Sequence, residues 1–231
     1  MEKVYTGKTK DVYKLNEEEY LLKFKDDVTG NDGVFDPGAN SVGLTMEGAG
    51  HQAVAMTKFF YEKLNDKGLT THFISADLDK NEAIVKKAEV FGQGVEVIVR
   101  YYAVGSFIRR YGKYIESGTK INPYVEITLK DDEREDPLIT KDALVLLDIM
   151  TEEEYEELKD LALKIGEIVR EELGKKDLDL YDIKFEFGRI EDGKVALIDE
   201  ISGGNMRAYK GDKYIEPLEL EKIMLGLLIR L

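Results

Sequence analysis

The chain has 231 residues, of which 43% are hydrophobic and 35% charged, so wholesale disorder is excluded. Asp and Glu (47) outnumber Lys and Arg (33), and this net charge of −14 disfavours general nucleic-acid binding. There is no cysteine, which excludes disulfides, zinc fingers, iron–sulfur sites and thiol nucleophiles. The two histidines, His51 and His72, lie far apart in sequence and offer little material for a histidine metal site or triad.

The first residues lack the apolar stretch of a signal peptide, and no apolar run is long enough to cross a bilayer. We therefore expect a cytoplasmic protein that does not bind membranes.

Short strands around one helix are predicted for the first hundred residues. The helix begins near Ala49, where apolar residues start to recur at steps of three and four, and it stops near Gly68. The expected strands cover residues 11–15, 20–25, 71–74, 83–90 and 95–100.

A long amphipathic helix is predicted in the second half. Thr151 and Glu154 form a capping box before an apolar periodicity that runs to Leu173, and Gly174 ends it. The acidic outer face of this helix is interpreted as solvated. Pro217 fits the first turn of a closing helix that extends through residue 228.

The segment 181–200 is predicted to be a β-hairpin with one polar face. Apolar residues at 181, 183, 185 and 187 alternate with Asp182, Lys184 and Glu186. Asp192-Gly193 is typical of a two-residue hairpin turn. With that turn, Glu186 lies directly opposite Asp199, with Cβ atoms about 4.5–5.5 Å apart.

Two carboxylates in that position repel each other unless a cation lies between them. Lys184, on the same face, is one candidate. The other is a divalent ion held by Glu186, Asp199 and phosphate oxygens, as Mg²⁺ is held in phosphoryl-transfer sites. An exposed hairpin with neutralising charges is the plain alternative, and periodicity alone does not decide between these interpretations.

Two further segments suggest phosphate binding. Residues 7–10, Gly-Lys-Thr-Lys, combine a permissive glycine with Lys8 and Lys10, although the spacing is not that of a Walker A loop and, taken alone, the segment is more typical of a charged hairpin. Arg100 precedes Gly105-Ser106, where Ser106 is expected to be the N-cap of a short helix, and helix N-termini bind phosphates. An ordinary capped helix is the alternative.

A dense acidic loop, residues 130–137, could contribute a metal ligand or simply be solvated.

Taken together and in order, these segments resemble SAICAR synthases, the purine-biosynthesis ligases that join aspartate to a carboxyaminoimidazole ribotide. The matching segments are residues 5–13, 24–29 with Asp32 and Gly33, 95–100 with Gly105 and Ser106, 130–137, 182–188, and 199–202 with Arg207.

The resemblance implies an α+β architecture in which a small β-rich lobe (residues 1–94) and a larger α+β lobe (residues 95–231) enclose ATP. It also implies small-molecule substrates (a phosphorylated ribotide, aspartate and ATP), Mg²⁺ as cofactor, no nucleic-acid partner, and a family in which a homodimer is possible. By resemblance, the residues at ATP are Lys8, Lys10 and the hinge segment from Glu89 to Glu96. The metal ligands implied are Glu186 and Asp199.

On the acceptor side, the resemblance places Lys184 near the ribotide carboxylate and Asp136 near the metal, as the catalytic candidates. The ribotide 5′-phosphate is assigned to Arg100, Ser106 and Arg207. The loop at Asp32 and Gly33 is expected to close over the second substrate.

Three departures from the family pattern fall on what we expect to be the acceptor side. Gly203-Gly204 replace Pro-Asp, Tyr101 replaces Asn, and residues 47–50 replace a Gly-Lys-Gly. Asn205 is expected to supply the missing carbonyl oxygen to the ligand. Two alternatives therefore stay open, a paralogous ligase with another phosphorylated carboxylate and a nucleotide-binding module without ligase activity.

Overall fold

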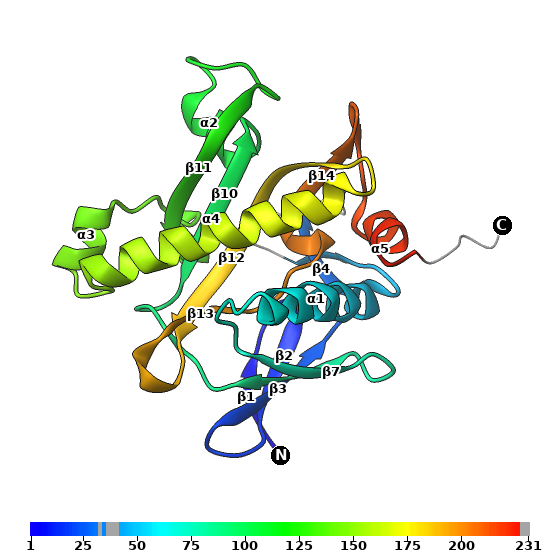
Figure 1. The fold of residues 1–231 in the computed structure, drawn as a ribbon, viewed down its shortest axis with the longest axis vertical. Coiled ribbons are helices and arrows are strands. Elements are labelled where there is room, and N and C mark those ends of the chain that lie inside the picture. The colour runs from blue at the N-terminus through cyan, green and yellow to red at the C-terminus, as the bar shows by residue number, and fades with distance from the viewer. Residues whose placement is uncertain (32–33, 36–41, 227–231) are drawn as a thin grey trace.

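The computed structural model describes the chain except residues 32–33, 36–41 and 227–231. Helices and two large antiparallel sheets are interleaved, with the first sheet at one end of the molecule and the second behind the long helix α4 (Figure 1). The expected α+β class is confirmed. The predicted loop at Asp32 and Gly33 lies outside the described residues.

The first sheet is formed by the N-terminal hairpins and has the order β1-β2-β3-β8-β7. Its strands are β1 (Glu2–Thr6), β2 (Lys10–Lys14), β3 (Glu19–Phe24), β7 (Phe73–Asp77) and β8 (Glu82–Lys86). The strand expected over residues 83–90 is in fact two strands, because the chain leaves β8 at Lys86 and continues as β9 in the second sheet.

The second sheet is built around β12, the strand predicted to carry the polar face. Its main order is β11-β10-β12-β14-β15, and β13 and β9 also pair with β12. The strands are β9 (Glu89–Val90), β10 (Val95–Tyr102), β11 (Lys120–Leu129), β12 (Asp179–Arg189), β13 (Val195–Ile198), β14 (Met206–Lys210) and β15 (Lys213–Tyr214). A small third sheet contains β4 (Asp27–Asn31), β5 (Val34–Phe35) and β6 (Val42–Thr45).

Two long helices bury the apolar faces of these sheets. The helix α4 crosses the second sheet, and α1 lies between α4 and the first sheet (Figure 1). The α-helices are α1 (Ala49–Asp66), α2 (Ser106–Tyr111), α3 (Lys141–Leu146), α4 (Glu152–Gly174) and α5 (Pro217–Leu225), and the 3-10 turns are η1 (Asp132–Arg134), η2 (Glu191–Gly193) and η3 (Gly203–Asn205). Within the described residues, no helix is long and apolar enough to cross a membrane.

The apolar side chains of both sheets, α1, α4 and α5 form one continuous core. On β12 the odd-numbered residues Ile183, Phe185 and Phe187 are buried in it. The even-numbered residues of the same stretch therefore face away from α4, toward the other side of the sheet.

The predicted capping box of α4 is present. Thr151 Oγ1 accepts a hydrogen bond from the Glu154 amide at 3.2 Å, and the Glu154 carboxylate accepts one from the Thr151 amide at 2.8 Å. The helix α5 starts at Pro217 as expected but ends at Leu225, three residues earlier than predicted, where Gly226 adopts the left-handed conformation (φ 69°) that ends helices.

Thr151→Ala removes one half of this capping box. We expect the free energy of unfolding to fall by about 1 kcal/mol, because an amide at the helix start loses its acceptor. Urea denaturation measures the change, with the exposed Glu157→Ala on the same helix as a control that should change stability by less than about 0.5 kcal/mol. Equal effects of the two substitutions would show that the cap is not what stabilises α4.

Candidate active site

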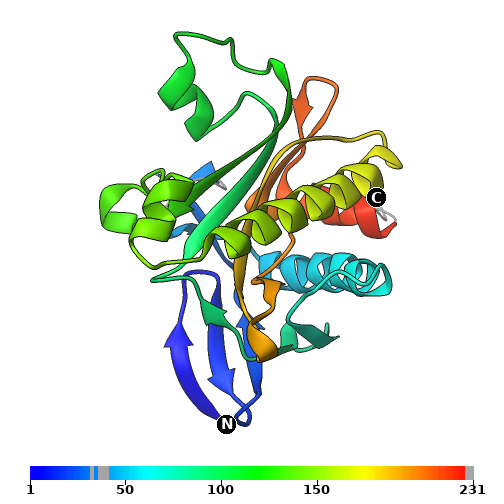
Figure 2. The ribbon, with the colours of Figure 1, turned by 60° about the vertical axis from the view of Figure 1, so that its left-hand side comes forward.

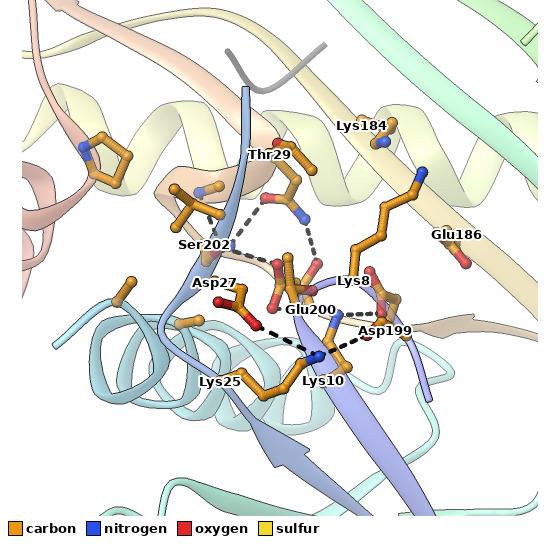
Figure 3. Close-up of a pocket in the computed structure, with 18 of the residues that line it drawn as sticks. Lys8, Lys10, Lys25, Asp27, Thr29, Lys184, Glu186, Asp199, Glu200 and Ser202 are labelled. Atoms are coloured by element: carbon orange, nitrogen blue, oxygen red, sulfur yellow. Dashed lines mark hydrogen bonds and ion pairs between the residues drawn. The ribbon is translucent and has the colours of Figure 1, made fainter. Parts of the chain in front are cut away.

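A charged pocket lies where the first sheet, α1 and the second sheet meet. Figure 3 shows lysines approaching it from the N-terminal strands and carboxylates from β12 and the segment after β13. The charged residues that line it are Lys8, Lys10, Lys25, Asp27, Glu96, Lys130, Asp132, Asp136, Lys184, Glu186, Asp199 and Glu200.

The predicted register of the β12–β13 hairpin is wrong by one residue. The turn contains three residues rather than two, because Asp192 and Gly193 both have positive φ (65° and 71°) and the Ile190 amide donates to the Lys194 carbonyl. Glu186 therefore pairs with Ile198, and Asp199 lies one position beyond the end of β13.

Asp199 nevertheless reaches the same pocket as Glu186, because its own backbone leaves the strand conformation. Its φ is 67°, in the left-handed region that few residues other than glycine adopt. Asp199 Oδ1 accepts a hydrogen bond from Lys10 Nζ at 2.6 Å, and Glu186 Oε1 accepts one from Lys130 Nζ at 2.6 Å. The two carboxylates thus lie in one pocket, as predicted, but the backbone conformation of Asp199 brings them together rather than the strand alternation.

The two carboxyl groups have opposite pKa shifts. Burial and the charge of Asp199 raise the pKa of Glu186. Burial also disfavours the Asp199 anion, but the ammonium groups of Lys10 and Lys130 outweigh burial and hold the pKa of Asp199 at about 2. The same carboxylates raise the pKa of Lys10 despite its burial. The carboxylates of the site therefore carry more negative charge than its lysines neutralise, and the excess is felt at Glu186.

Sequence reasoning missed Glu200 and Lys130. Glu200 lies 3.4 Å from Lys10 Nζ and accepts a hydrogen bond from Ser202 Oγ, and burial raises its pKa. Simple alternation would place Glu200 on the face opposite Asp199, so only the backbone break at Asp199 brings both into the pocket. Lys130 stands in the acidic loop, where no sequence signal identifies its partner 56 residues away.

Lys184 occupies the middle of the polar face of β12. Its Nζ donates to Glu96 Oε1 at 2.6 Å, so Glu96 contributes its side chain to the pocket. Asp136 also lines the pocket, and burial and the nearby Glu96 raise its pKa. Residues 132–135 of the same loop are exposed, although Asp132 still lines the pocket. Glu89 is exposed in β9 and does not line the pocket.

Arg100 lies further along the same face of the sheet and is completely buried. Its guanidinium donates to Glu126 Oε1 (2.7 Å from Nε), to Asp182 Oδ2 (2.6 Å), to the Val104 carbonyl (3.2 Å) and to Ser106 Oγ (2.8 Å). Arg100 is 2% exposed and all these bonds are to neighbouring groups of the protein. It therefore orders neighbouring side chains and does not face the pocket.

The N-cap of α2 is Gly105, not Ser106 as predicted. Gly105 has a φ of 58°, and a Cβ there would lie 2.9 Å from Arg207 Nη1, so the position requires glycine. Ser106 is the first helical residue, and its hydroxyl is engaged by Arg100. Arg207 Nη1 donates to both oxygens of Asp182 at 2.9 and 3.1 Å. Arg100, Ser106 and Arg207 thus form one cluster beside the pocket.

Two departures from the family pattern are packing features. Tyr101 is 2% exposed and faces α4, where the absence of a side chain at Gly166 makes room for its hydroxyl. A Cβ on Gly203 would lie 2.7 Å from Pro217 Cα. Tyr101 is therefore not on the acceptor side, and that expectation was wrong.

Asn205, which we expect to offer its carbonyl oxygen to a ligand, lines the pocket, and its side chain also binds the backbone of its own turn. Asn205 Oδ1 accepts from the Ser202 amide at 3.0 Å, and its Nδ2 donates to the Glu200 carbonyl at 2.6 Å. The side chain fixes the turn that carries Glu200. Gly204 lines the pocket, as does Ala49 of the departing segment 47–50, so these departures face a ligand directly.

The family model for SAICAR synthetase matches residues 3–223, nearly the whole chain. The chain belongs to the SAICAR synthetase family. It is 61% identical to the phosphoribosylaminoimidazole-succinocarboxamide synthase of Clostridium tetani over 226 residues, covering 97% of this chain and 100% of that protein. The predicted family and the ligase function in purine biosynthesis are confirmed.

Solved SAICAR synthetases have the same fold. The synthase of Ehrlichia chaffeensis superposes with a TM-score of 0.82 at 31% identity, covering 98% of this chain and 92% of that one. A SAICAR synthetase solved in complex with ADP superposes with a TM-score of 0.81 at 29% identity, covering 96% and 89%.

The opposite pKa shifts of Glu186 and Asp199 predict opposite effects of neutralising them in the ligand-free protein. The lowered pKa of Asp199 means that its charge stabilises the fold above pH 3.8, a contribution lost as the pH falls through about 2. Asp199→Asn should therefore lower the free energy of unfolding at pH 7 by about 2 kcal/mol.

Glu186 has a raised pKa, so its ionisation costs stability as the pH rises above 4.5, and Glu186→Gln should raise the free energy of unfolding at pH 7. This gain should shrink at pH 4, where the carboxyl is mostly protonated in both states. Urea denaturation with EDTA at both pH values measures these changes. Destabilisation by Glu186→Gln at pH 7 would contradict the assigned charge balance.

Proposed function

We propose that this protein uses Mg-ATP to join the amine of L-aspartate to the carboxyl group of carboxyaminoimidazole ribotide, through an acyl phosphate. One observation carries the proposal. The partly buried carboxylates Glu186 and Asp199 share a pocket with lysines from both halves of the chain, Lys10 from β2 and Lys130 from the loop after β11. Such a pocket suits a polyphosphate with its metal ion.

The donor set fits Mg²⁺. Among the residues that the structure describes, no three His, Asp or Glu side chains are grouped so as to hold a metal by themselves. Mg²⁺ is commonly bound by one or two carboxylates with substrate phosphates and water, and Glu186 and Asp199 would be these carboxylates. Bound there, it would neutralise charge on the phosphoryl group during transfer.

The nucleotide is placed between residues 1–94 and 95–231, which we propose act as two lobes. Lys8 and Lys10, on and next to the β1–β2 turn, would neutralise its phosphates. Lys8 Nζ is 2.6 Å from Asp132 and partly exposed, so it can exchange this partner for a phosphate. The segment from Glu89 to Glu96 would supply backbone contacts to adenine. The ADP complex of a family member supports a nucleotide site.

The acceptor would lie along the polar face of β12, with its carboxylate at Lys184 and its phosphate at Ser106 and Arg207. Asp182 and Glu186 are four residues apart, or about 13 Å along a strand, which leaves room for a ribotide between the two ends. Arg100 does not touch the phosphate in this arrangement, because its donors are already engaged, and it orients Ser106 instead. Asp136 would orient the reacting groups near Lys184.

The chemistry follows from this placement. A carboxylate does not react with an amine directly, because an oxide is too poor a leaving group. Transfer of the γ-phosphoryl group to a carboxylate oxygen gives an acyl phosphate and ADP. The aspartate amine then attacks the carbonyl carbon, forming the C–N bond while the C–O bond to phosphate breaks and the amine loses a proton. The lysines and carboxylates need only position and neutralise charges, which requires no covalent nucleophile.

The test is an assay of the purified protein with the ribotide, L-aspartate and Mg-ATP, following ADP and the succinocarboxamide product. We expect stoichiometric product and ADP, and no turnover when any one substrate or Mg²⁺ is omitted. Nucleotide binding without phosphate release would instead support a non-catalytic module. Turnover only with another phosphorylated carboxylate would support a paralogous ligase, and either result would overturn the proposal.

Glu186→Gln and Asp199→Asn should each lower kcat/KM by at least about a hundred-fold, because each removes a charge that holds the metal. The exposed Glu133→Gln, in the neighbouring acidic loop, is the matched control and should retain wild-type turnover. Titrating Mg-ADP by calorimetry separates binding from chemistry. Unchanged Mg-nucleotide affinity in both site variants would exclude them as metal ligands.

A further inference from the structure

Glu126 is a buried carboxylate outside the pocket, and no step proposed above uses it. It lies on β11, opposite Ile98 of β10, so its side chain is on the same face of the sheet as Arg100. Its side chain is 1% exposed. A buried charge is costly unless it is paired, so its partners show what it stabilises.

Two arginines from different elements meet at one oxygen of Glu126. Oε1 accepts hydrogen bonds from Nε and Nη2 of Arg100 and from Nη2 of Arg110, whereas Oε2 has no hydrogen-bond partner within the described residues. Arg100 belongs to β10 and Arg110 to α2. Glu126 therefore ties the sheet to α2.

The helix α2 is a short element that a few side-chain contacts hold to the sheet, as far as the described residues show. It has six residues, none of them buried, and it sits on an arm formed by the ends of β10 and β11 that projects from the body of the molecule (Figures 1 and 2). Among the described residues, its other side-chain contacts with the sheet include the hydrogen bond from Arg100 to Ser106, the edge contact of Phe107 with Tyr124 and the position of Phe107 beside the Arg100 guanidinium. The Arg110–Glu126 ion pair is thus, beside the Arg100–Ser106 hydrogen bond, a polar tether of this helix.

This tether determines where Ser106 stands. Arg100, held by Glu126 and Asp182, donates a hydrogen bond to Ser106 Oγ at 2.8 Å. Because that bond occupies a lone pair of the hydroxyl oxygen, the Ser106 proton remains available for an acceptor on the other side. Nearby, Asp182 also holds Arg207 against Gly105.

We propose that Glu126 is a positioning residue for the acceptor substrate: through Arg100 and Arg110 it holds Ser106 in place to donate to the ribotide phosphate. The inference rests on the proposed placement of that phosphate at Ser106 and Arg207. Glu126 itself does not touch the substrate.

Glu126→Gln keeps the size and one acceptor oxygen but removes the charge that orders both arginines. We expect KM for the ribotide to rise about ten-fold, while KM for Mg-ATP and kcat at saturating ribotide change less than two-fold, because the reacting groups are untouched. Calorimetry with the ribotide alone should show the same loss of affinity. Thr151→Ala, remote and mildly destabilising, is the control and should leave all three kinetic constants unchanged.

Arg110→Ala tests the tether from its other end and keeps the inference falsifiable if Glu126→Gln does not fold. It should also raise KM for the ribotide, and the double variant should be no worse than Glu126→Gln alone, since both break one interaction. Parallel rises in both KM values, or unchanged ribotide KM in both variants, would overturn the role of Glu126.

Ser106→Ala and Arg207→Ala distinguish this failure from that of the proposed function. If they raise KM for the ribotide while Glu126→Gln and Arg110→Ala do not, only the positioning role falls. If Ser106→Ala and Arg207→Ala leave that KM unchanged, the phosphate lies elsewhere and the inference falls together with the proposed placement.

Discussion

The active site depends on the alternating direction of the side chains along β12, which places three charged residues on one face of the second sheet. Asp182, Lys184 and Glu186 each carry a charge that burial makes costly. Each is paired with an opposite charge that another element supplies, namely Arg100, Glu96 and Lys130. The consequence is a row of three ion pairs across the sheet, with the carboxylate-rich pocket at one end and the arginine cluster at the other.

Two irregularities of the backbone complete the pocket end of this row. The three-residue turn moves Asp199 one position out of the register that would face Glu186, and the left-handed conformation of Asp199 turns the chain so that its carboxylate meets Lys10. A non-glycine residue in this conformation costs free energy, and such strain is typical of functional sites. Asn205 then holds the turn that follows, through the Ser202 amide and the Glu200 carbonyl.

Features that depend on the spacing of a few consecutive residues could be predicted from the sequence. The capping box of Thr151 and Glu154, the apolar period of α4 and the polar face of β12 depend on local spacing, and all three are present. Local spacing failed, however, at the Asp192-Gly193 turn, which is one residue longer than predicted, and other failures depend on contacts outside the motif. Ser106 was expected to cap α2, but Arg100 engages its hydroxyl, and no sequence pattern indicates that Glu126 and Lys130 would meet partners 26 and 56 residues away.

The same distinction explains the departures from the family pattern. A sequence motif treats position 101 as part of the acceptor side because it follows Arg100, yet successive residues of a strand face opposite ways. Tyr101 faces α4 and fits there because residue 166 is glycine, so its identity is a matter of helix–sheet packing. Gly203 is likewise required by the close approach of Pro217. Of the departures from the family pattern, Gly204 and Ala49 line the pocket, so neither Tyr101 nor Gly203 is a reason to expect a different acceptor.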